Sequence, residues 1–183
     1  MNLFNFDKGK SDFKKILEEQ AKREAAYIKM SAAELAELSD DELFNAAWVR
    51  TDKIASLKEN MIEGFNSLSE AQRIFYAVYL LEMEVNNGGL CQFFVNSSRM
   101  VAPIVSECMG IIGASEHKNL FNTFINKYQI DLCDLASFNC ETAEAYASQY
   151  ERYPFEEYDN AFYTLEPLQG YLTSFVKNHT DKF

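Results

Sequence analysis

Apolar residues recur at three- and four-residue spacing along most of this 183-residue chain, which is the pattern of amphipathic helices. The most apolar of these patterns follows Ser69. One stripe of a helix there would be formed by Ile74, Val78, Leu81 and Val85. Further apolar residues flank the stripe, and a helix that is apolar around most of its circumference belongs in the interior. The pattern therefore predicts an all-α, single-domain multi-helix bundle around a buried central helix at about residues 69–86.

The two ends of this central helix carry recognisable signals. Ser69 with Gln72 three residues later forms a capping box, which begins a helix. Gly88 and Gly89 are adjacent, and glycine readily adopts the positive φ that ends a helix. The next residues, 90–96, are expected to form a short helix at a new angle and to bring two phenylalanines into the core.

Shorter amphipathic patterns on both sides of the central helix predict further helices. Capping residues or prolines mark most of their first turns. We expect them at residues 31–38, 39–62, 101–112 and 115–128, from about residue 141 to Pro154, and after Pro167. Gly64 and Asn66 are expected to form the turn into the central helix, and Gly113 is expected to follow the end of the helix at Ile112.

Residues 1–30 differ in composition from the rest of the chain. They hold seven basic and five acidic residues, whereas the remainder is acidic overall. An amphipathic helical arm after Asp12 is predicted by Phe13, Ile16, Leu17, Ala21, Ala25 and Ile28. We expect this arm to pack on the domain formed by residues 31–183 or on a second copy of the chain, which would give a homodimer. A nucleic-acid-binding arm is less favoured because three glutamates interrupt its positive charge.

Two carboxylates interrupt the apolar surface of the central helix. Glu82 would lie between Phe75 and Val78, and Glu84 would lie on the flank of the helix. A buried carboxylate must accept hydrogen bonds or stay protonated. We expect the donors within residues 86–89, directly after the two glutamates.

Three interpretations of this turn compete. Glu84, Gln92 and Asn96 could form a carboxylate–amide catalytic set. The glycine pair before a helix start could instead hold an anion, although Arg99 is the only cation nearby. The third interpretation, which we favour, is a polar corner that fixes the angle between two core helices.

The residues around the glycine pair also form a longer motif. Its members are Glu84, Asn86, Asn87, Gly88, Gly89, Gln92, Phe93, Phe94, Asn96 and Ser97. The motif resembles the signature of a bacterial family catalogued as a domain of unknown function, whose named member is a DNA-mimic protein. The family pattern is approximately E-V-x-N-G-G-F-x-Q-F/Y-F-x-N-S, and this chain departs from it mainly at Leu90, where phenylalanine is usual. Weaker similarity extends over about residues 38–183.

The resemblance carries its own expectations about fold and activity. It implies an all-α fold and, for the named member, binding to a DNA-binding transcription regulator in place of DNA. Because a fold does not fix a function, this activity is an expectation for the present chain. We expect the motif residues themselves to be structural.

The charge of the chain limits the classes of partner. It has 17 Lys and Arg residues against 28 Asp and Glu residues, a formal net charge of −11. This balance argues against direct binding to nucleic acid or to an anionic membrane surface. It permits a basic protein partner, although many proteins are acidic only for solubility.

No pattern in the sequence predicts a metal site or a cofactor. His117 and His179 have no partner at ligand spacing, and we expect both to be exposed to solvent. The four cysteines show no C-x-x-C spacing and are expected to be reduced and mainly buried. No apolar run is long enough for a signal peptide or a membrane span, so we expect a cytoplasmic protein.

Residues 131–166 form the most acidic segment, with nine acidic residues and one basic residue. Candidate partner-binding residues there are Asp131, Asp134, Glu141, Glu144, Glu151, Glu156, Glu157 and Asp159. A DNA mimic must hold carboxylates on a rigid surface at spacings near those of phosphates. A solvated acidic face would give the same sequence pattern. Five tyrosines interleaved with the acidic residues could anchor an interface.

These observations together favour a protein without enzymatic activity that binds a basic, DNA-binding protein through an acidic helical surface. An immunity or inhibitor-type protein that blocks a basic enzyme site is the alternative. A hydrolase-like enzyme that uses Glu84, Gln92 and Asn96 is the third hypothesis. Sets with a histidine-activated nucleophile and phosphate-binding loops are absent from the sequence.

Overall fold

The computed structural model describes residues 6–183, and this range contains helices and no strand. The α-helices are α1 (Phe6–Lys29), α2 (Ala32–Ala36), α3 (Asp40–Ala55), α4 (Met61–Asn66), α5 (Glu70–Val95), α6 (Ala102–Ile111), α7 (Ser115–Tyr128), α8 (Ala143–Arg152), α9 (Phe155–Phe162) and α10 (Leu168–Lys177). Short 3-10 helices are η2 (Ser97–Val101), η3 (Ala136–Phe138) and η4 (Thr180–Lys182). The predicted all-α fold class is confirmed.

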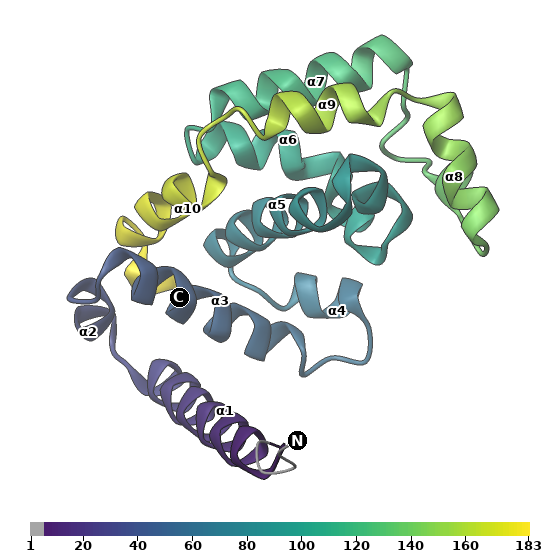
Figure 1. Ribbon diagram of the computed structural model, residues 1–183. Coiled ribbons are helices and arrows are strands. Elements are labelled where there is room, and N and C mark those ends of the chain that lie inside the picture. Colours follow the sequence, from purple (N-terminus) through teal and green to yellow (C-terminus); the bar gives the residue numbers. More distant parts are fainter. Residues whose placement is uncertain (1–5) are drawn as a thin grey trace.

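Helix α5 lies at the centre of the fold, as the hydrophobic pattern predicts (Figure 1). Helices α6 and α9 pack on one side of it and α7 packs against both of them, while α3, α4 and α10 contact α5 from the other side (Figure 1). Three members of the predicted stripe, Val78, Leu81 and Val85, are fully buried. The core is thus a single cluster built around α5.

The start of α5 is the predicted capping box. The Gln72 backbone N–H donates to Ser69 Oγ at 3.2 Å, and the Ser69 backbone N–H donates to Gln72 Oε1 at 3.1 Å. The helix then runs to Gly88 and Gly89, where its backbone leaves the helical conformation, and resumes as far as Val95. The predicted short helix at a new angle after the glycine pair is therefore confirmed.

The helix predicted over residues 39–62 is wrong in its length. The structure ends α3 at Ala55 and begins α4 at Met61, after a turn that Asn60 caps by accepting from the Glu63 backbone N–H at 3.0 Å. Gly64 lies inside α4 and not in a turn. The position requires glycine because a Cβ there would lie 2.5 Å from the Ala55 carbonyl oxygen. A close approach of two helices explains this glycine better than a chain reversal does.

The glycine expected after α6 has the predicted role. Gly113 has φ +86°, and its N–H donates to the Gly110 carbonyl at 3.2 Å. The Ala114 N–H donates to the Met109 carbonyl at 2.9 Å. This pair of bonds is the Schellman arrangement that closes a helix C-terminus.

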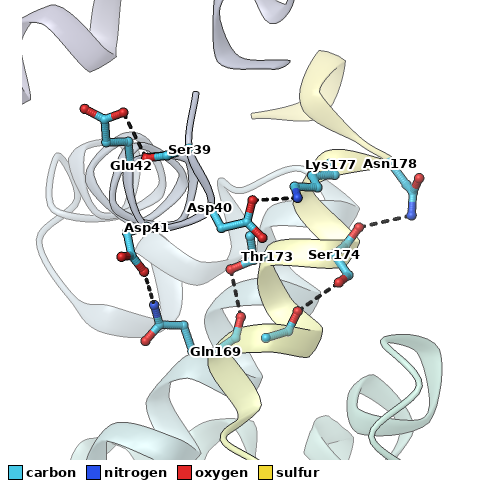
Figure 2. A network of polar contacts seen from close by, with 10 residues as sticks. Ser39, Asp40, Asp41, Glu42, Gln169, Thr173, Ser174, Lys177 and Asn178 are labelled. Carbon is cyan, nitrogen blue, oxygen red and sulfur yellow. Dashed lines mark hydrogen bonds and ion pairs between the residues drawn. The ribbon is translucent and has the colours of Figure 1, made fainter. Parts of the chain in front are cut away.

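Polar contacts join α3 to α10 near the end of the chain. Figure 2 shows Asp40 of α3 paired with Lys177 of α10, and the Nζ to Oδ1 distance is 2.6 Å. Gln169 Nε2 donates to Asp41 Oδ1 at 3.3 Å (Figure 2). All four side chains are exposed, so each contact contributes at most about 1 kcal/mol and apolar packing holds these helices together.

Helix α1 includes the amphipathic pattern predicted for the N-terminal arm. Residues 1–5 of the arm lie outside the described range. Its C-terminal end packs on α3, where Tyr27 is buried. Arg50 of α3 fixes that end because its Nη1 donates to the Tyr27 and Met30 carbonyl oxygens at 3.2 and 2.7 Å. The arm is thus tied to the rest of the chain at one end.

His117, which we expected at the surface, is only 1% exposed. Its ring packs edge-on against Phe162 and Tyr171, with ring centroids 5.2 and 6.0 Å away. Its Nδ1 has no hydrogen-bond partner within the described part of the chain. The expectation was wrong because α9 and α10, distant in sequence, cover the first turn of α7. His179 is half-buried, and its Nδ1 lies 2.8 Å from the Phe175 carbonyl oxygen.

We expect the free energy of unfolding to fall as the pH drops from about 7 to about 5, in part because of His117. Burial lowers the pKa of His117 in the folded chain, partly opposed by Glu116. The unfolded chain therefore binds a proton at a higher pH than the folded chain, and stability is lost between those two pKa values. Urea unfolding should show a weaker pH dependence for His117→Phe than for the parent chain. An unaltered pH dependence in His117→Phe would contradict this assignment.

Candidate functional site

The bend in α5 is the part of the structure where the motif residues gather. Gly88 has φ −160° and ψ 23°, and Gly89 has φ +80° and ψ 177°. The Gly89 conformation is essentially restricted to glycine. A Cβ on Gly89 would also overlap the Asp159 carboxylate of α9. Both the backbone geometry and the close approach of α9 therefore require glycine at this position.

The backbone groups that the bend releases from helical pairing are bound by side chains of α8, α9 and the turn after it. The Leu90 N–H donates to Asp159 Oδ1 at 2.8 Å. The Tyr163 hydroxyl donates to the Val85 carbonyl at 2.6 Å. The Tyr146 and Tyr150 hydroxyls both lie 3.4 Å from the Gly88 carbonyl oxygen. The backbone N–H and carbonyl groups of the bend thus find hydrogen-bond partners more than fifty residues away in sequence.

Glu84 is the polar centre of the bend and is 5% exposed. Its Oε2 accepts from Gln92 Nε2 at 2.7 Å and from Asn96 Nδ2 at 2.9 Å. Its Oε1 accepts from Ser98 Oγ at 2.6 Å. Because three donors surround the carboxylate, Glu84 joins the two halves of α5 and the start of η2.

The donors expected within residues 86–89 were therefore the wrong ones. Asn86 and Asn87 are exposed, and in the part of the chain that the structure describes neither donates a hydrogen bond to Glu82 or Glu84. Glu82 instead accepts from the Leu168 backbone N–H at 2.7 Å, at the first residue of α10. Burial raises the pKa of Glu82, and the backbone hydrogen bonds from Leu168 and Gln169 oppose that rise.

The remaining motif residues divide between core and surface. Phe93 and Phe94 are fully buried, as predicted, and Phe94 stacks on Phe138 with a centroid distance of 4.9 Å. Ser97 is exposed at the start of η2. The two phenylalanines therefore anchor the second half of α5 in the core.

This geometry favours an architectural role for the bend over a catalytic one. Glu84 is enclosed and its oxygens are occupied by Gln92, Asn96 and Ser98, so it has no access to a substrate in this arrangement. Within residues 12–183, whose side chains are described, no cluster of His, Cys, Asp and Glu residues is arranged to hold a metal ion. Among residues 12–183 the anion interpretation finds no cation at the bend either, because Arg99 binds the Asn139 side chain and the Phe94 carbonyl.

The four cysteines are free thiols. Cys91 and Cys108 are buried as expected, whereas Cys133 is exposed and Cys140 is half-buried. Burial raises the pKa of Cys91 to about 12 and that of Cys108 to about 11. Neither buried thiol is therefore a nucleophile at neutral pH.

The candidate partner-binding residues of the acidic segment have different environments. We use the term acidic surface for the exposed carboxylates of α8, α9 and the turn before α8, which are Glu141, Glu144, Glu151, Glu156 and Glu157. Asp131 and Asp134 are exposed but accept hydrogen bonds from the Cys133 and Ala136 backbone N–H groups, at 2.9 and 3.2 Å. Asp159 is half-buried at the bend of α5.

Cations within residues 12–183 reach little of the acidic surface. Lys127 Nζ lies 3.7 Å from Glu157 Oε2, and both side chains are exposed. Arg152 is directed to the Tyr153 ring, with its Cζ 5.1 Å from the ring centroid. An exposed pair at 3.7 Å neutralises its carboxylate only weakly.

Comparison with known proteins gives one family match. A family model described as DMP19-like protein matches residues 66–179. The chain belongs to the DMP19-like family. The resemblance drawn from the motif at the α5 bend is thereby confirmed. Neither the curated proteins nor the solved structures provide a match.

The matched range of this DMP19-like chain contains the whole α5 bend and all of α8 and α9, whereas α1, α2 and α3 precede it. In the part of the DMP19-like chain that the structure describes, none of the helices has the length and apolar character needed to cross a membrane. The family match and the acidic surface thus fall in the same half of the fold.

Several residues that bind the DMP19-like bend were missed from the sequence, among them Ser98, Asp159 and the tyrosines that contact the Val85 and Gly88 carbonyls. Ser98 lies one position beyond the motif, and no spacing rule connects it with Glu84. Asp159 was assigned to the partner-binding set because it lies in an acidic segment, whereas its carboxylate binds the Leu90 N–H. The signal available in the sequence was the released N–H after a glycine pair, which requires an acceptor from elsewhere in the chain.

Proposed function

We propose that this DMP19-like protein acts without enzymatic chemistry by binding a basic, DNA-binding protein through its acidic surface, in place of DNA. Family membership supports this role. The observation that carries the proposal is the set of exposed glutamates on α8 and at the start of α9. A basic groove made for phosphates would meet carboxylates there.

The placement of α8 supports a fixed spacing of these charges. Glu144 and Glu151 are seven residues apart on α8, which puts them on one face about 10.5 Å apart along the helix axis. Tyr146 and Tyr150 of the same helix reach the Gly88 carbonyl at the α5 bend. The bend therefore serves the proposed function indirectly, because it contributes to holding the charged helix in position.

The overall charge favours a cationic partner and opposes contact with nucleic acid. With a formal net charge of −11, the chain repels phosphates and attracts a basic surface over roughly 8–10 Å at physiological salt. Because such attraction is screened, binding to the proposed partner should weaken as salt rises.

Replacing both Glu144 and Glu151 by glutamine should weaken binding to the DNA-binding partner about tenfold, because two exposed charge contacts are lost. The partner is first captured on the immobilised full chain, identified, and released with duplex DNA. Binding is then measured by calorimetry or biosensor at several salt concentrations. The control is Glu59→Gln with Glu63→Gln, which removes the same charge at the exposed start of α4.

The outcomes separate mimicry from the alternatives. Release by duplex DNA, together with a loss specific to the α8 variant, would support the proposal. Retention of a protein that does not bind DNA, or equal affinity of the α8 variant and the control, would contradict it. An inhibitor would instead retain one enzyme and silence it, with no competition from DNA.

A further inference from the structure

A hollow lies where α3, α5 and the start of α10 meet. Its volume is about 420 Å³. Phe44 of α3 and Tyr79 of α5 form an aromatic wall of the hollow, with ring centroids 6.1 Å apart. Glu82, nearly one turn after Tyr79 on the same face of α5, also lines the hollow. The hollow therefore combines an aromatic surface with a carboxylate whose residue is only 9% exposed.

Amide side chains lie at the opening of this hollow. Asn86 and Asn87 of α5 and Gln169 of α10 belong to its lining, and all three are exposed. Figure 2 shows Gln169 joined to Asp41 of α3, with Nε2 3.3 Å from Oδ1. These amides can donate and accept hydrogen bonds, but they add no positive charge.

The charge of Glu82 is only partly balanced by the chain itself. Within residues 12–183, no Lys or Arg side chain forms an ion pair with it. Its hydrogen bonds come from backbone N–H groups at the start of α10, and the Leu168 N–H lies 2.7 Å from Oε1. Burial nevertheless raises the pKa of Glu82. A bound cation would offset the remaining cost of burying this carboxylate.

The chemistry of the hollow favours an organic cation over a metal ion. A hard metal ion requires several oxygen ligands, and among residues 12–183 no group of His, Cys, Asp and Glu side chains could hold one. Aromatic rings such as those of Phe44 and Tyr79 instead attract an organic cation through their faces. They also pack against the hydrocarbon chain that carries it.

The hydrogen bond from Leu168 distinguishes between the two common organic cations of proteins. A guanidinium binds best through both oxygens of a carboxylate. Oε1 of Glu82 already accepts from the Leu168 N–H. An ammonium is a compact charge and needs only one oxygen as its acceptor. The site therefore fits a primary ammonium better than a guanidinium.

We propose that the hollow between α3, α5 and α10 binds a primary alkylammonium group, with the ammonium on Glu82 and the alkyl chain against Phe44 and Tyr79. A lysine side chain of another protein and a free amine both carry this group. The amides at the opening favour lysine, because they can bond to the peptide groups on either side of it. The site includes no residue of the acidic surface, so it does not depend on the function proposed above.

The first test is an NMR titration of the full chain with Nα-acetyl-lysine N-methylamide, the lysine probe, at physiological salt. We expect half-saturation at about 1 to 10 mM, which is the range of a single small contact. The Leu168 and Gln169 backbone amides should shift, because both N–H groups bond to Glu82. The corresponding norleucine probe lacks the ammonium and should bind more weakly by about tenfold or more.

Two further probes define the ligand. The corresponding arginine probe should bind about threefold more weakly than the lysine probe, because Oε1 of Glu82 is occupied. Pentylamine carries the ammonium and alkyl chain without peptide groups. Tighter binding of the lysine probe would assign the site to a protein side chain, and tighter binding of pentylamine would assign it to a free amine.

Glu82→Gln removes the charge and keeps an oxygen that can accept from the Leu168 N–H. It should weaken binding of the lysine probe about tenfold. The matched control is Glu107→Gln, which removes the same charge at an exposed position of α6 and should leave binding unchanged. Phe44→Leu should weaken binding about threefold, because one aromatic face is lost. Circular dichroism checks that each variant retains the helical content of the parent.

Four results would overturn the proposal. The first is equal binding of the lysine and norleucine probes. The second is parent affinity in both Glu82→Gln and Phe44→Leu. The third is a set of NMR shifts confined to the acidic surface, since the probe would then respond only to net charge. The fourth is tighter binding of the arginine probe, which would contradict the choice of an ammonium. If Glu82→Gln does not fold, Phe44→Leu and the position of the shifts decide.

Discussion

Replacing Gly89 by alanine is expected to lower the free energy of unfolding by about 3 kcal/mol. The φ of +80° with ψ 177° strains any residue that has a Cβ. That Cβ would also overlap the Asp159 carboxylate. Relief of the overlap would move α9 and remove the acceptor of the Leu90 N–H. Urea unfolding followed by circular dichroism measures the loss.

Gly113→Ala is the matched control for this substitution. Gly113 has a similar φ of +86°, but a Cβ there would meet nothing within 4 Å. Backbone strain alone should cost about 1–2 kcal/mol. The difference between the two variants therefore reports the contact with α9 together with the greater backbone strain of the Gly89 conformation. Equal losses would show that neither the close approach of Asp159 nor the unusual Gly89 conformation adds to the cost of a Cβ at the bend.

Removal of the Glu84 side chain by Glu84→Ala is expected to destabilise the fold by about 3 kcal/mol. The substitution leaves Ser98 buried without its acceptor and frees Gln92 and Asn96 from their common partner. Glu84→Gln should show a smaller loss of about 1–2 kcal/mol, because one acceptor oxygen remains while an amide group faces other donors. Thermal and urea unfolding give both values.

Glu107→Ala, at an exposed position of α6, is the control and should change stability by less than about 0.5 kcal/mol. The architectural role of the bend further predicts that folded Glu84→Gln binds the partner of the acidic surface with the parent affinity. A variant that is as stable as the parent but inactive would instead revive the catalytic hypothesis for Glu84, Gln92 and Asn96.

Features set by neighbouring residues were predictable from the sequence. The capping box at Ser69, the bend at Gly88 and Gly89, and the end of α6 at Gly113 depend on backbone preferences within one or two turns. The burial of Phe93 and Phe94 followed from the helix that must restart after the bend. Each of these predictions required only local geometry.

Features set by distant residues were not predictable. The Leu168 N–H binds Glu82 and Asp159 binds the Leu90 N–H, across 86 and 69 residues of sequence. The burial of His117 similarly depends on Phe162 and Tyr171. A side-chain pattern identifies a group that needs a partner, but only the packing of the helices selects that partner.

The attachment of α8 to the α5 bend has a consequence for binding experiments. The hydroxyls of Tyr146 and Tyr150 both contact the Gly88 carbonyl oxygen. Neither of these contacts involves a formal charge. Added electrolyte therefore attenuates the field of the glutamates without loosening these links. A salt titration of the binding affinity would consequently measure the ionic contribution to complex formation while α8 keeps its position.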